Sequence, residues 1–348
     1  MDMWLFSVLW FIVLMTCFFK NKKFVFYAIL FLFSLLIGFR SETVGADTYV
    51  YADIYEMIGQ NGYEGYPEPL YGYFNYVCYQ LGLQFNVMQW IVSCIMLFLF
   101  ANVIVKNSPN RNSSLFFLFS LFFIFYSMNV TRQMLAVSVV LYGYYLLDLE
   151  KVKGFILCMV IAATCHLSAL VAFSILLIRN VKLNSFYFYL LLIFSFVIGT
   201  FFFDGNIFRI IAGPYAKFFV ESDAGIRTGD RIFYAILLIL FWNILCIFIY
   251  KTAKKEILDT LWFKIYLFGL LINNMTYRLE LGLRIVFYFS IVQIIFFPIY
   301  LSNNREREKL FIWGVLLMFV GIFFFVFLSN GSAGVLPYSN LLFDELCK

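Results

Sequence analysis

The stretch FVFYAILFLFSLLIGFRSETVGADTYVYADIY, residues 24–55, decides the fold class. Its first part, Phe24 to Phe39, is an apolar run long enough to cross a membrane as a helix. The chain then turns abruptly polar and carries four charged residues, Arg40, Glu42, Asp47 and Asp53. This pattern predicts a spanning helix that ends in a polar surface loop. The loop is either a site of chemistry or an ordinary cap whose arginine reaches lipid headgroups.

The composition extends this pattern to the whole chain. Of its 348 residues, 64% are hydrophobic and only 13% are charged, whereas a soluble domain carries roughly a quarter charged residues. The polar stretches are too short to bury a core of their own. We therefore expect an all-α, polytopic integral membrane protein with a single transmembrane domain over residues 1–348.

Apolar runs mark the expected membrane crossings, and about 10–12 helices are predicted because roughly 20 apolar residues span a bilayer. The expected spans are Met3–Phe19, Phe24–Phe39, Asn86–Val105, Ser114–Asn129, Arg132–Leu149, Asn184–Phe203, Arg231–Tyr250, Thr260–Tyr277, Leu283–Leu301 and Leu310–Leu328. The run Gly154–Ile178 is either one further span or a broken hairpin with His166 near its tip. The hairpin is preferred because it brings the isolated polar features to one face.

The loops between the spans predict the orientation. Clusters such as Lys20–Lys23 and Lys151–Lys153 lie in short connections, which the positive-inside rule assigns to the cytoplasm. Residues 40–85 then form an outer loop, and residues 204–230 form a second one. Within the first loop, the tyrosine-rich segment Pro69–Leu83 is predicted to be a re-entrant or interfacial helix, although an aromatic belt explains the same composition.

The sequence lacks the motifs that several classes of function require. The seven cysteines form no C-x-x-C pair and there is one histidine, so neither a disulfide framework nor a metal centre is indicated. We find no glycine-rich phosphate loop and therefore expect no nucleotide cofactor. The net charge of +5 comes from short loops, so no nucleic-acid partner is expected.

Arginines at the ends of expected spans are the first candidates for a site. On the outer face these are Arg40, Arg132, Arg278 and Arg284. A guanidinium donates paired hydrogen bonds to phosphate and stays charged when partly buried. The cluster predicts an anionic partner such as a diphosphate, with contact to lipid headgroups as the alternative.

His166, the outer carboxylates and the tyrosines complete the candidate set. Ionisable groups at membrane depth are costly and are functional candidates for that reason, and an imidazole serves as a general base. Asp47 is a second candidate base, while Glu42 and Asp53 are candidates to hold sugar hydroxyls. Tyr49 and Tyr51 offer flat faces and polar tips that suit sugar rings. A buried structural histidine and an interfacial tyrosine belt remain the alternatives.

Three groups of motifs give this sequence a resemblance to the EpsG family, the Wzy-like polysaccharide polymerases of bacterial inner membranes. The first is RSETVGADTYVYADIYEMI (40–58) with EPLYGYFNYV (68–77). The second is NVTRQMLAVSVVLYGYYLL (129–147) with ATCHLSAL (163–170), and the third is VLPYSNLLF (335–343). Arg132 and Gly143 have the R-x10-G spacing of O-antigen polymerases. Residues 203–231 match no pattern of the family.

The resemblance implies a GT-C-like helical fold and a glycosyltransferase without metal or other cofactor. Its substrate would be an undecaprenyl-diphosphate-linked oligosaccharide, joined at the outer face of the bacterial inner membrane into O-antigen, capsule or exopolysaccharide. Membrane lipid and a chain-length regulator protein are the other implied partners. By the matching motif positions, His166, Asp47 and Arg132 would be catalytic, and Arg40 and Arg132 would bind the diphosphate. Arg278 and Arg284 are added to the diphosphate site from their positions at the ends of spans and not from a motif.

Two other functions remain open from the sequence. A related ligase would pass a finished glycan to another acceptor, although ligases usually show a larger late outer loop. A flippase or exporter of the lipid-linked oligosaccharide would place charges at mid-membrane depth, whereas the charges here gather at one face.

Overall fold

The computed structural model describes residues 2–342 apart from 19–21, 202–229, 280–281 and 305. The regular secondary structure of this part of the chain consists of helices, and its single β-type contact is an isolated bridge between Arg40 and Asn340. The all-α prediction is therefore confirmed. The predicted second outer loop, 204–230, lies almost entirely outside the described residues.

The contacts between residues divide the chain into two compact units. The first comprises residues 1–170, 297–302 and 307–348, and the second comprises 171–296 and 303–306. Each unit is described here by itself. The organisation as one membrane domain remains a prediction.

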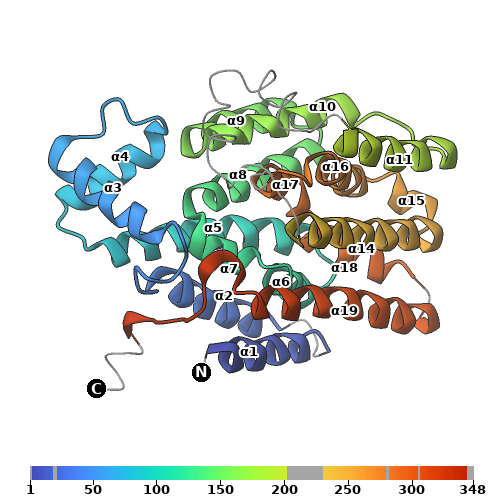
Figure 1. The fold of residues 1–348 in the computed structure, drawn as a ribbon, viewed down its shortest axis with the longest axis horizontal. Coiled ribbons are helices and arrows are strands. Elements are labelled where there is room, and N and C mark those ends of the chain that lie inside the picture. Colours follow the sequence, from blue (N-terminus) through green and yellow to red (C-terminus); the bar gives the residue numbers. More distant parts are fainter. Residues whose placement is uncertain (1, 19–21, 202–229, 280–281, 305, 343–348) are drawn as a thin grey trace. The chain divides into compact units, whose positions relative to one another are not determined.

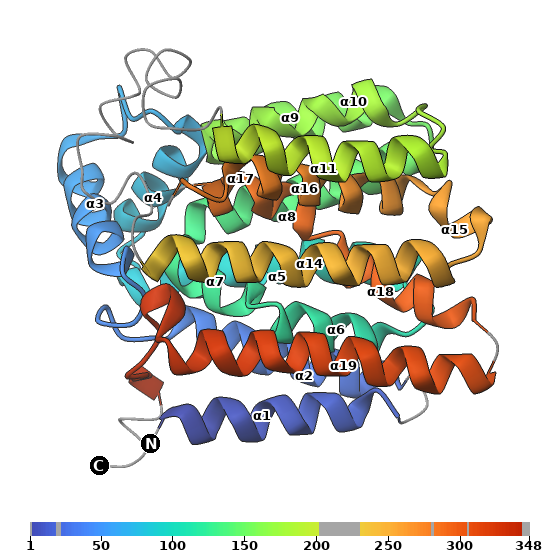
Figure 2. The same cartoon turned by 45° about the vertical axis from the view of Figure 1, so that its right-hand side comes forward.

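The first unit holds the N-terminal helices and the last long helix (Figures 1 and 2). Its helices are α1 (Asp2–Thr16), α2 (Lys23–Gly38), α3 (Thr48–Asn61), α4 (Pro69–Gln80), α5 (Phe85–Asn107), α6 (Arg111–Ser120), α7 (Phe123–Asn129), α8 (Thr131–Asp148), α9 (Val152–Cys165), α19 (Glu306–Ser329) and the short η3 (Ser332–Gly334).

The second unit contains the middle of the chain. Its elements are η1 (Leu167–Ser174), which begins in the first unit, α10 (Ile175–Ile178), α11 (Ser185–Phe201), α14 (Asp230–Thr252), α15 (Lys255–Leu258), α16 (Leu261–Thr276), α17 (Gly282–Ser290) and α18 (Gln293–Ser302), which ends in the first unit. Helix α16 packs against α11, α14 and α17.

Three described helices are long and apolar enough to cross a membrane, namely α5, α14 and α19. Two bent pairs raise the number to five if each is one span: α6 with α7, bent by 51°, and α17 with α18, bent by 43°. Shorter apolar helices cover several of the remaining predicted spans, including α1, α2 and α11. The protein is thus a polytopic membrane protein, and the total of 10–12 crossings remains a prediction.

Exposed apolar side chains on the first unit agree with a lipid-facing surface. Trp4 on α1 is 78% exposed, Phe24 on α2 is 83% exposed and Leu310 on α19 is 75% exposed. A water-facing protein rarely shows large apolar groups in such continuous areas. These helix faces are therefore suited to contact acyl chains.

The bent helix α6–α7 forms the aromatic core of the first unit. Phe122, between the two helices, adopts a left-handed conformation with φ of 68°, which ends α6 and redirects the chain. Its ring stacks on Phe125 with centroids 4.4 Å apart and approaches Phe324 of α19 at 5.6 Å. Because α8 starts directly after α7, the bend also determines where α8 begins.

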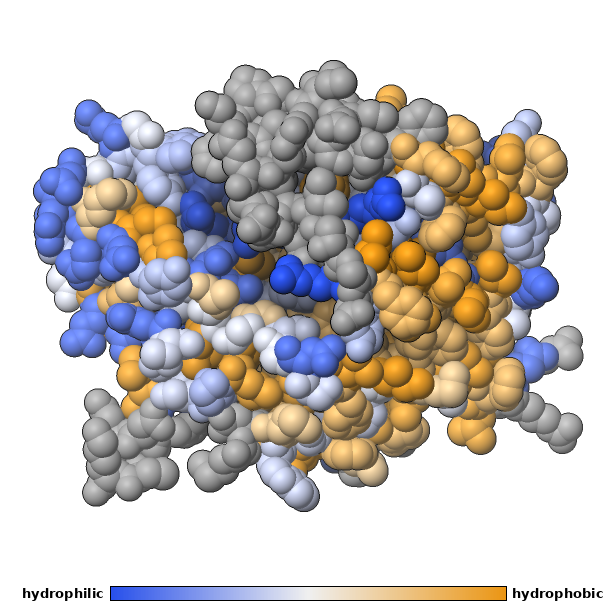
Figure 3. All heavy atoms as spheres, in the orientation of Figure 1, coloured by the Kyte–Doolittle hydropathy of each residue, from blue (hydrophilic) through white to orange (hydrophobic). Residues whose placement is uncertain are grey.

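The polar loop after α2 folds into a helical cap. Helices α3 and α4 lie side by side, and α4 also contacts α5 and α9. Figure 3 shows hydrophilic side chains gathered over this cap, at the left of the view. The segment predicted as a re-entrant or interfacial helix does form a helix, α4, and its placement relative to the membrane remains a prediction.

Candidate functional site

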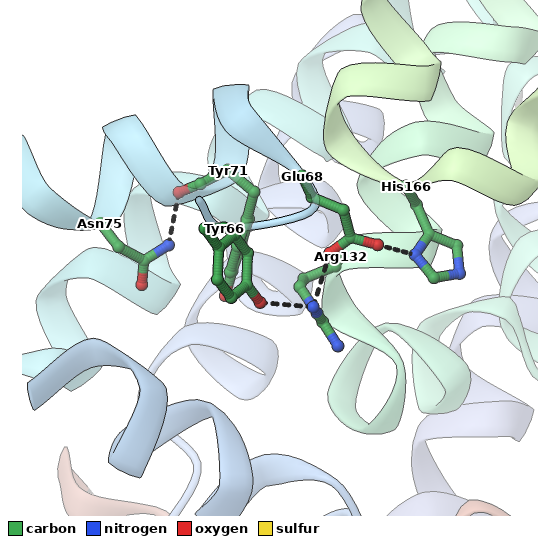
Figure 4. A network of polar contacts seen from close by, with 6 residues as sticks. All are labelled: Tyr66, Glu68, Tyr71, Asn75, Arg132 and His166. Atoms are coloured by element: carbon green, nitrogen blue, oxygen red, sulfur yellow. Dashed lines mark hydrogen bonds and ion pairs between the residues drawn. The ribbon is translucent and has the colours of Figure 1, made fainter. Parts of the chain in front are cut away.

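A carboxylate that bridges a guanidinium and an imidazole lies at the centre of the site (Figure 4). Glu68 Oε2 accepts a hydrogen bond from Nη1 of Arg132 at 2.5 Å, and its Oε1 is in hydrogen-bond contact with Nδ1 of His166. Glu68 is only 6% exposed. Because a buried carboxylate requires charged or hydrogen-bonded partners, Arg132 and His166 stabilise the Glu68 carboxylate.

The sequence around Glu68 explains why its carboxylate can bind Arg132 and His166. Glu68 precedes Pro69, the first residue of α4, a position that proline favours. The side chain of Glu68 makes no capping hydrogen bond to α4, although its backbone carbonyl accepts one from Gly72. The carboxylate therefore extends away from the helix that it begins.

Three tyrosines surround the guanidinium of Arg132. The Tyr51 ring centroid lies 5.0 Å from Cζ of Arg132, and the rings of Tyr66 and Tyr71 lie at 5.9 Å. Arg132 also donates a hydrogen bond to the hydroxyl of Tyr66. Burial raises the pKa of Tyr66, so this hydroxyl stays protonated at neutral pH. Cation–π contacts of this kind fix a guanidinium without neutralising it.

Close packing of α8 against α9 brings Arg132 and His166 together. Eleven residues make almost three whole helical turns, so Arg132 and Gly143 lie on the same face of α8. A Cβ atom at Gly143 would lie 2.7 Å from Cε of Met159 and 3.1 Å from Cβ of Cys158, both on α9. The R-x10-G spacing therefore places Arg132 on the same face of α8 as a glycine against which α9 can pack closely.

His166 marks the break in the ambiguous run Gly154–Ile178. Helix α9 ends at Cys165, His166 is extended with φ of −160° and ψ of 115°, and η1 begins at Leu167. The predicted break at His166 is confirmed. Since Glu68 binds both Arg132 at the start of α8 and His166 at the end of α9, the two helices run in opposite directions. The direction of the chain after His166, and therefore the hairpin, remains a prediction.

Arg40 takes a structural position next to this network. It is 1% exposed and donates hydrogen bonds to the carbonyl of Ile37 at 2.5 Å and to the hydroxyl of Thr131 at 3.0 Å. Its Nε and Nη2 both lie 3.4 Å from Oγ1 of Thr48. Burial lowers the pKa of Arg40 to about 10, so it remains a cation at neutral pH.

Through Thr131, Arg40 ties the end of α2 to the start of α8. In the described structure its guanidinium binds protein groups only. Its predicted role in diphosphate binding is untested, and its contacts favour a supporting role.

The C-terminal motif closes over the same end of α2. The hydroxyl of Tyr338 donates to the carbonyl of Leu36 at 2.9 Å, and Asn340 donates to the carbonyl of Leu35 at 3.2 Å. The backbone amide of Gly45 donates to the carbonyl of Gly334 at 2.8 Å. All three motif groups found in the sequence therefore meet around Arg40 and Arg132.

The remaining predicted residues of the first loop lie in different surroundings. Asp47 is half-buried and precedes α3, where its backbone amide donates to Oδ1 of Asn129 at 3.0 Å. Glu42, Asp53 and Tyr49 are exposed. Only Tyr51, among the four residues predicted to bind glycan, lies against Arg132.

The other two predicted arginines belong to the second unit. Arg278 follows α16 and donates a hydrogen bond to the carbonyl of Thr200 at 2.9 Å, which joins the ends of α16 and α11. Arg284 lies in α17 and is half-buried. Their predicted contact with a diphosphate remains a prediction.

Glu68, Tyr66 and Tyr71 were missed as site residues by sequence reasoning. The motif EPLYGYFNYV contained a signal for Glu68, because this residue is the one charged side chain of the motif and directly precedes a helix-starting proline. In the described part of the chain, no three His, Cys, Asp or Glu side chains are grouped so as to hold a metal ion.

The arrangement is suited to acid–base chemistry beside an anion. With its Nδ1 hydrogen on Glu68, a neutral imidazole presents the lone pair of Nε2, which faces away from Glu68 in Figure 4. Arg132 supplies a cation at the other oxygen of Glu68, and its buried Nε has no hydrogen-bond partner among the described residues. A buried donor of this kind is costly unless a ligand satisfies it.

Comparisons with known proteins agree with the motifs. No curated protein matches the chain, and no solved structure matches it, so the GT-C-like relationship remains a prediction. A family model, described as the EpsG family, matches residues 23–340, a range that contains Glu68, Arg132, His166 and the C-terminal contacts to α2. The chain therefore belongs to the EpsG family of Wzy-like polysaccharide polymerases.

Proposed function

We propose that this protein polymerises undecaprenyl-diphosphate-linked oligosaccharide repeat units at the outer face of the bacterial inner membrane. Family membership supports a polysaccharide polymerase-like role in the membrane. The observation that carries the finer proposal is the Glu68 carboxylate held between Arg132 and His166. It places a candidate base and a candidate anion-binding cation on the two oxygens of one group.

In the proposed reaction, a hydroxyl oxygen of the acceptor sugar forms a bond to the anomeric carbon of the donor. The bond between that carbon and the diphosphate oxygen breaks, and its electron pair leaves with undecaprenyl diphosphate. Nε2 of His166 takes the hydroxyl proton, while its Nδ1 hydrogen stays on Glu68. His166 later returns the proton to water. Glu68 is a positioning residue because it sets the imidazole's orientation and tautomer.

Arg132 stabilises the negative charge that develops on the departing diphosphate. Its side chain is 23% exposed, which leaves part of the guanidinium open to a ligand while Glu68 and Tyr66 fix Nη1. An incoming phosphate oxygen that reached the buried Nε would satisfy its missing hydrogen bond. Preorganised donors of this type stabilise a transition state without reorganisation.

Of the surrounding tyrosines, Tyr66 suits the carbohydrate part of the substrate best, because it is half-buried and its hydroxyl remains protonated. Tyr51 and Tyr71 are 4% and 2% exposed and hold the Arg132 guanidinium from the protein side. Aromatic faces and hydroxyl groups are the features that bind sugar rings. A chain-length regulator protein is a further proposed partner, because polymerases of this kind usually act with one.

A glycan ladder tests the proposal. A strain that lacks the protein is complemented with wild type, Arg132→Ala, or Arg111→Ala as a control that removes an arginine from the start of another helix, α6. We expect ladders with wild type and Arg111→Ala, and a single capped repeat with Arg132→Ala at equal protein abundance. A normal ladder with Arg132→Ala would remove Arg132 from the site. No surface glycan at all in the deletion strain would favour a ligase or exporter.

A further inference from the structure

A basic cavity in the second unit lies apart from every residue used above. Its volume is about 670 Å³, within the range of small-ligand sites. It is lined by the connection from α10 to α11, by α15 and by the start of α16. The charged residues on its wall are Arg179, Lys182, Lys255, Lys264 and Asp259. Four cations against one carboxylate leave the cavity strongly positive.

Lys264 contributes to this positive charge from a partly buried position. It lies near the start of α16, between buried Phe263 and buried Ile265, and it is only half-exposed. A helix start carries partial positive charge, so a lysine there is electrostatically unfavourable. Its Nζ donates to the carbonyl of Arg179 at 2.7 Å, which holds the ammonium group at the cavity wall. An anion in the cavity would offset this repulsion.

Exposed apolar side chains lie close in sequence to residues that line the cavity. Leu177, two residues before Arg179, is 80% exposed, Val181, next to Lys182, is 46% exposed, and Phe186, at the start of α11, is 70% exposed. Figure 3 shows orange, hydrophobic side chains over α10 and α11. A cationic cavity beside exposed apolar side chains has the two features that a phospholipid requires, one for its headgroup and one for its acyl chains.

We propose that this cavity binds the phosphate headgroup of an anionic membrane lipid. Arg179 and Lys264 form its inner wall, and the exposed Lys182 and Lys255 form its entrance. Leu177, Val181 and Phe186 contact the acyl chains. The predicted orientation, with the hairpin at His166, places this lipid in the cytoplasmic leaflet. The site is independent of the polymerase reaction.

Lipid binding by the purified full chain tests this proposal. The variant Lys182→Gln/Lys255→Gln removes two exposed charges from the cavity. The control Lys151→Gln/Lys153→Gln removes two exposed lysines at the start of α9, one directly before the helix and one in its first turn. Each protein is titrated in detergent with phosphatidylglycerol, phosphatidylcholine or inorganic phosphate. Bound lipid is counted by native mass spectrometry, and thermal stability is measured in parallel.

We expect wild type and the control to bind phosphatidylglycerol in preference to phosphatidylcholine, and the cavity variant to bind it about thirtyfold more weakly. That factor corresponds to about 1 kcal/mol for each of the two lost charges. Binding should weaken as salt is raised. If inorganic phosphate alone binds wild type and not the cavity variant, the site takes a soluble phosphate compound. Equal binding by the cavity variant and the control, or no preference for phosphatidylglycerol, would overturn the proposal.

Discussion

Arg132 and His166 contact the two oxygens of one carboxylate, that of Glu68, although Arg132 lies at the start of α8 and His166 directly follows the end of α9. Hydrogen bonds to charged groups contribute about 1.5–3 kcal/mol each. The relationship makes both residues depend on the same third residue. A change at Glu68 should therefore disturb the guanidinium of Arg132 and the imidazole of His166 together.

Replacement of Glu68 by glutamine should lower polymerisation by about a hundredfold. The amide has nearly the same shape but lacks the charge that orients both partners, and a catalytic group misplaced by about 1 Å costs a factor of this size. The measurement is the rate of ladder formation in membranes supplied with lipid-linked repeat units. Glu64→Gln, an exposed carboxylate in the same loop, serves as the control. Wild-type rates in Glu68→Gln would contradict the assigned role.

His166→Ala should abolish the ladder more completely than any change to the tyrosines. Loss of a general base costs about 10²–10⁴-fold in rate. Binding should persist, because Arg132 keeps its contacts with Tyr51 and Tyr66. Cross-linking to a photoreactive lipid-linked oligosaccharide measures binding separately from turnover. Loss of binding together with turnover would assign His166 to substrate recognition instead.

Tyr51 should hold Arg132 through its ring as well as its hydroxyl. Tyr51→Phe keeps an aromatic face about 5 Å from Cζ and loses only the contact of the hydroxyl with Arg132, whereas Tyr51→Leu also removes the cation–π contact, worth about 0.5–2 kcal/mol, so Tyr51→Leu should be the slower variant. Initial rates of both variants test this difference. If Tyr51→Phe fails as badly as Tyr51→Leu, the hydroxyl group is the important part of the side chain.

Gly143 should tolerate alanine and reject valine. An alanine Cβ would lie 2.7 Å from the flexible end of Met159, which can move, and 3.1 Å from Cβ of Cys158, which needs to shift only by a few tenths of an ångström, whereas the two further methyl groups of valine need more room. Overpacking of this kind costs about 1–3 kcal/mol. We expect Gly143→Val to unfold at a lower temperature and to lose polymer. A thermal melt of the detergent-solubilised protein compares the two variants. Equal melting of both would show that α8 and α9 do not need this close approach.

The amino-acid pattern predicts the helices well because apolar run length is a local property. The predicted spans at α5, α14 and α19 appear as single helices. The bends do not follow from run length: the run 114–129 is continuous in sequence, yet Phe122 turns to positive φ and divides it. That conformation depends on ring packing with Phe125 and Phe324, residues from two different helices.

The site was predictable only in part for a related reason. Arg132 and His166 are conspicuous as rare ionisable groups in apolar runs, and Tyr51 belonged to a visible tyrosine cluster. Arg40 seemed equally suitable, but its surroundings turn it inward to Thr48 and Thr131. Glu68 acquires its role only when α4 packs on α9, a contact between distant segments that no local pattern contains.

A double-mutant cycle on Glu68 and His166 tests the central claim most directly. Polymerisation rates are measured with the same lipid-linked repeat unit for wild type, Glu68→Gln, His166→Gln and the double variant, at equal amounts of folded protein. If Glu68 acts partly by holding His166, the loss of rate in the double variant should be smaller than the product of the two single losses, because Glu68→Gln in the His166→Gln background removes only the contact with Arg132. If the two losses multiply, Glu68 and His166 act independently and the proposed pairing in catalysis is wrong.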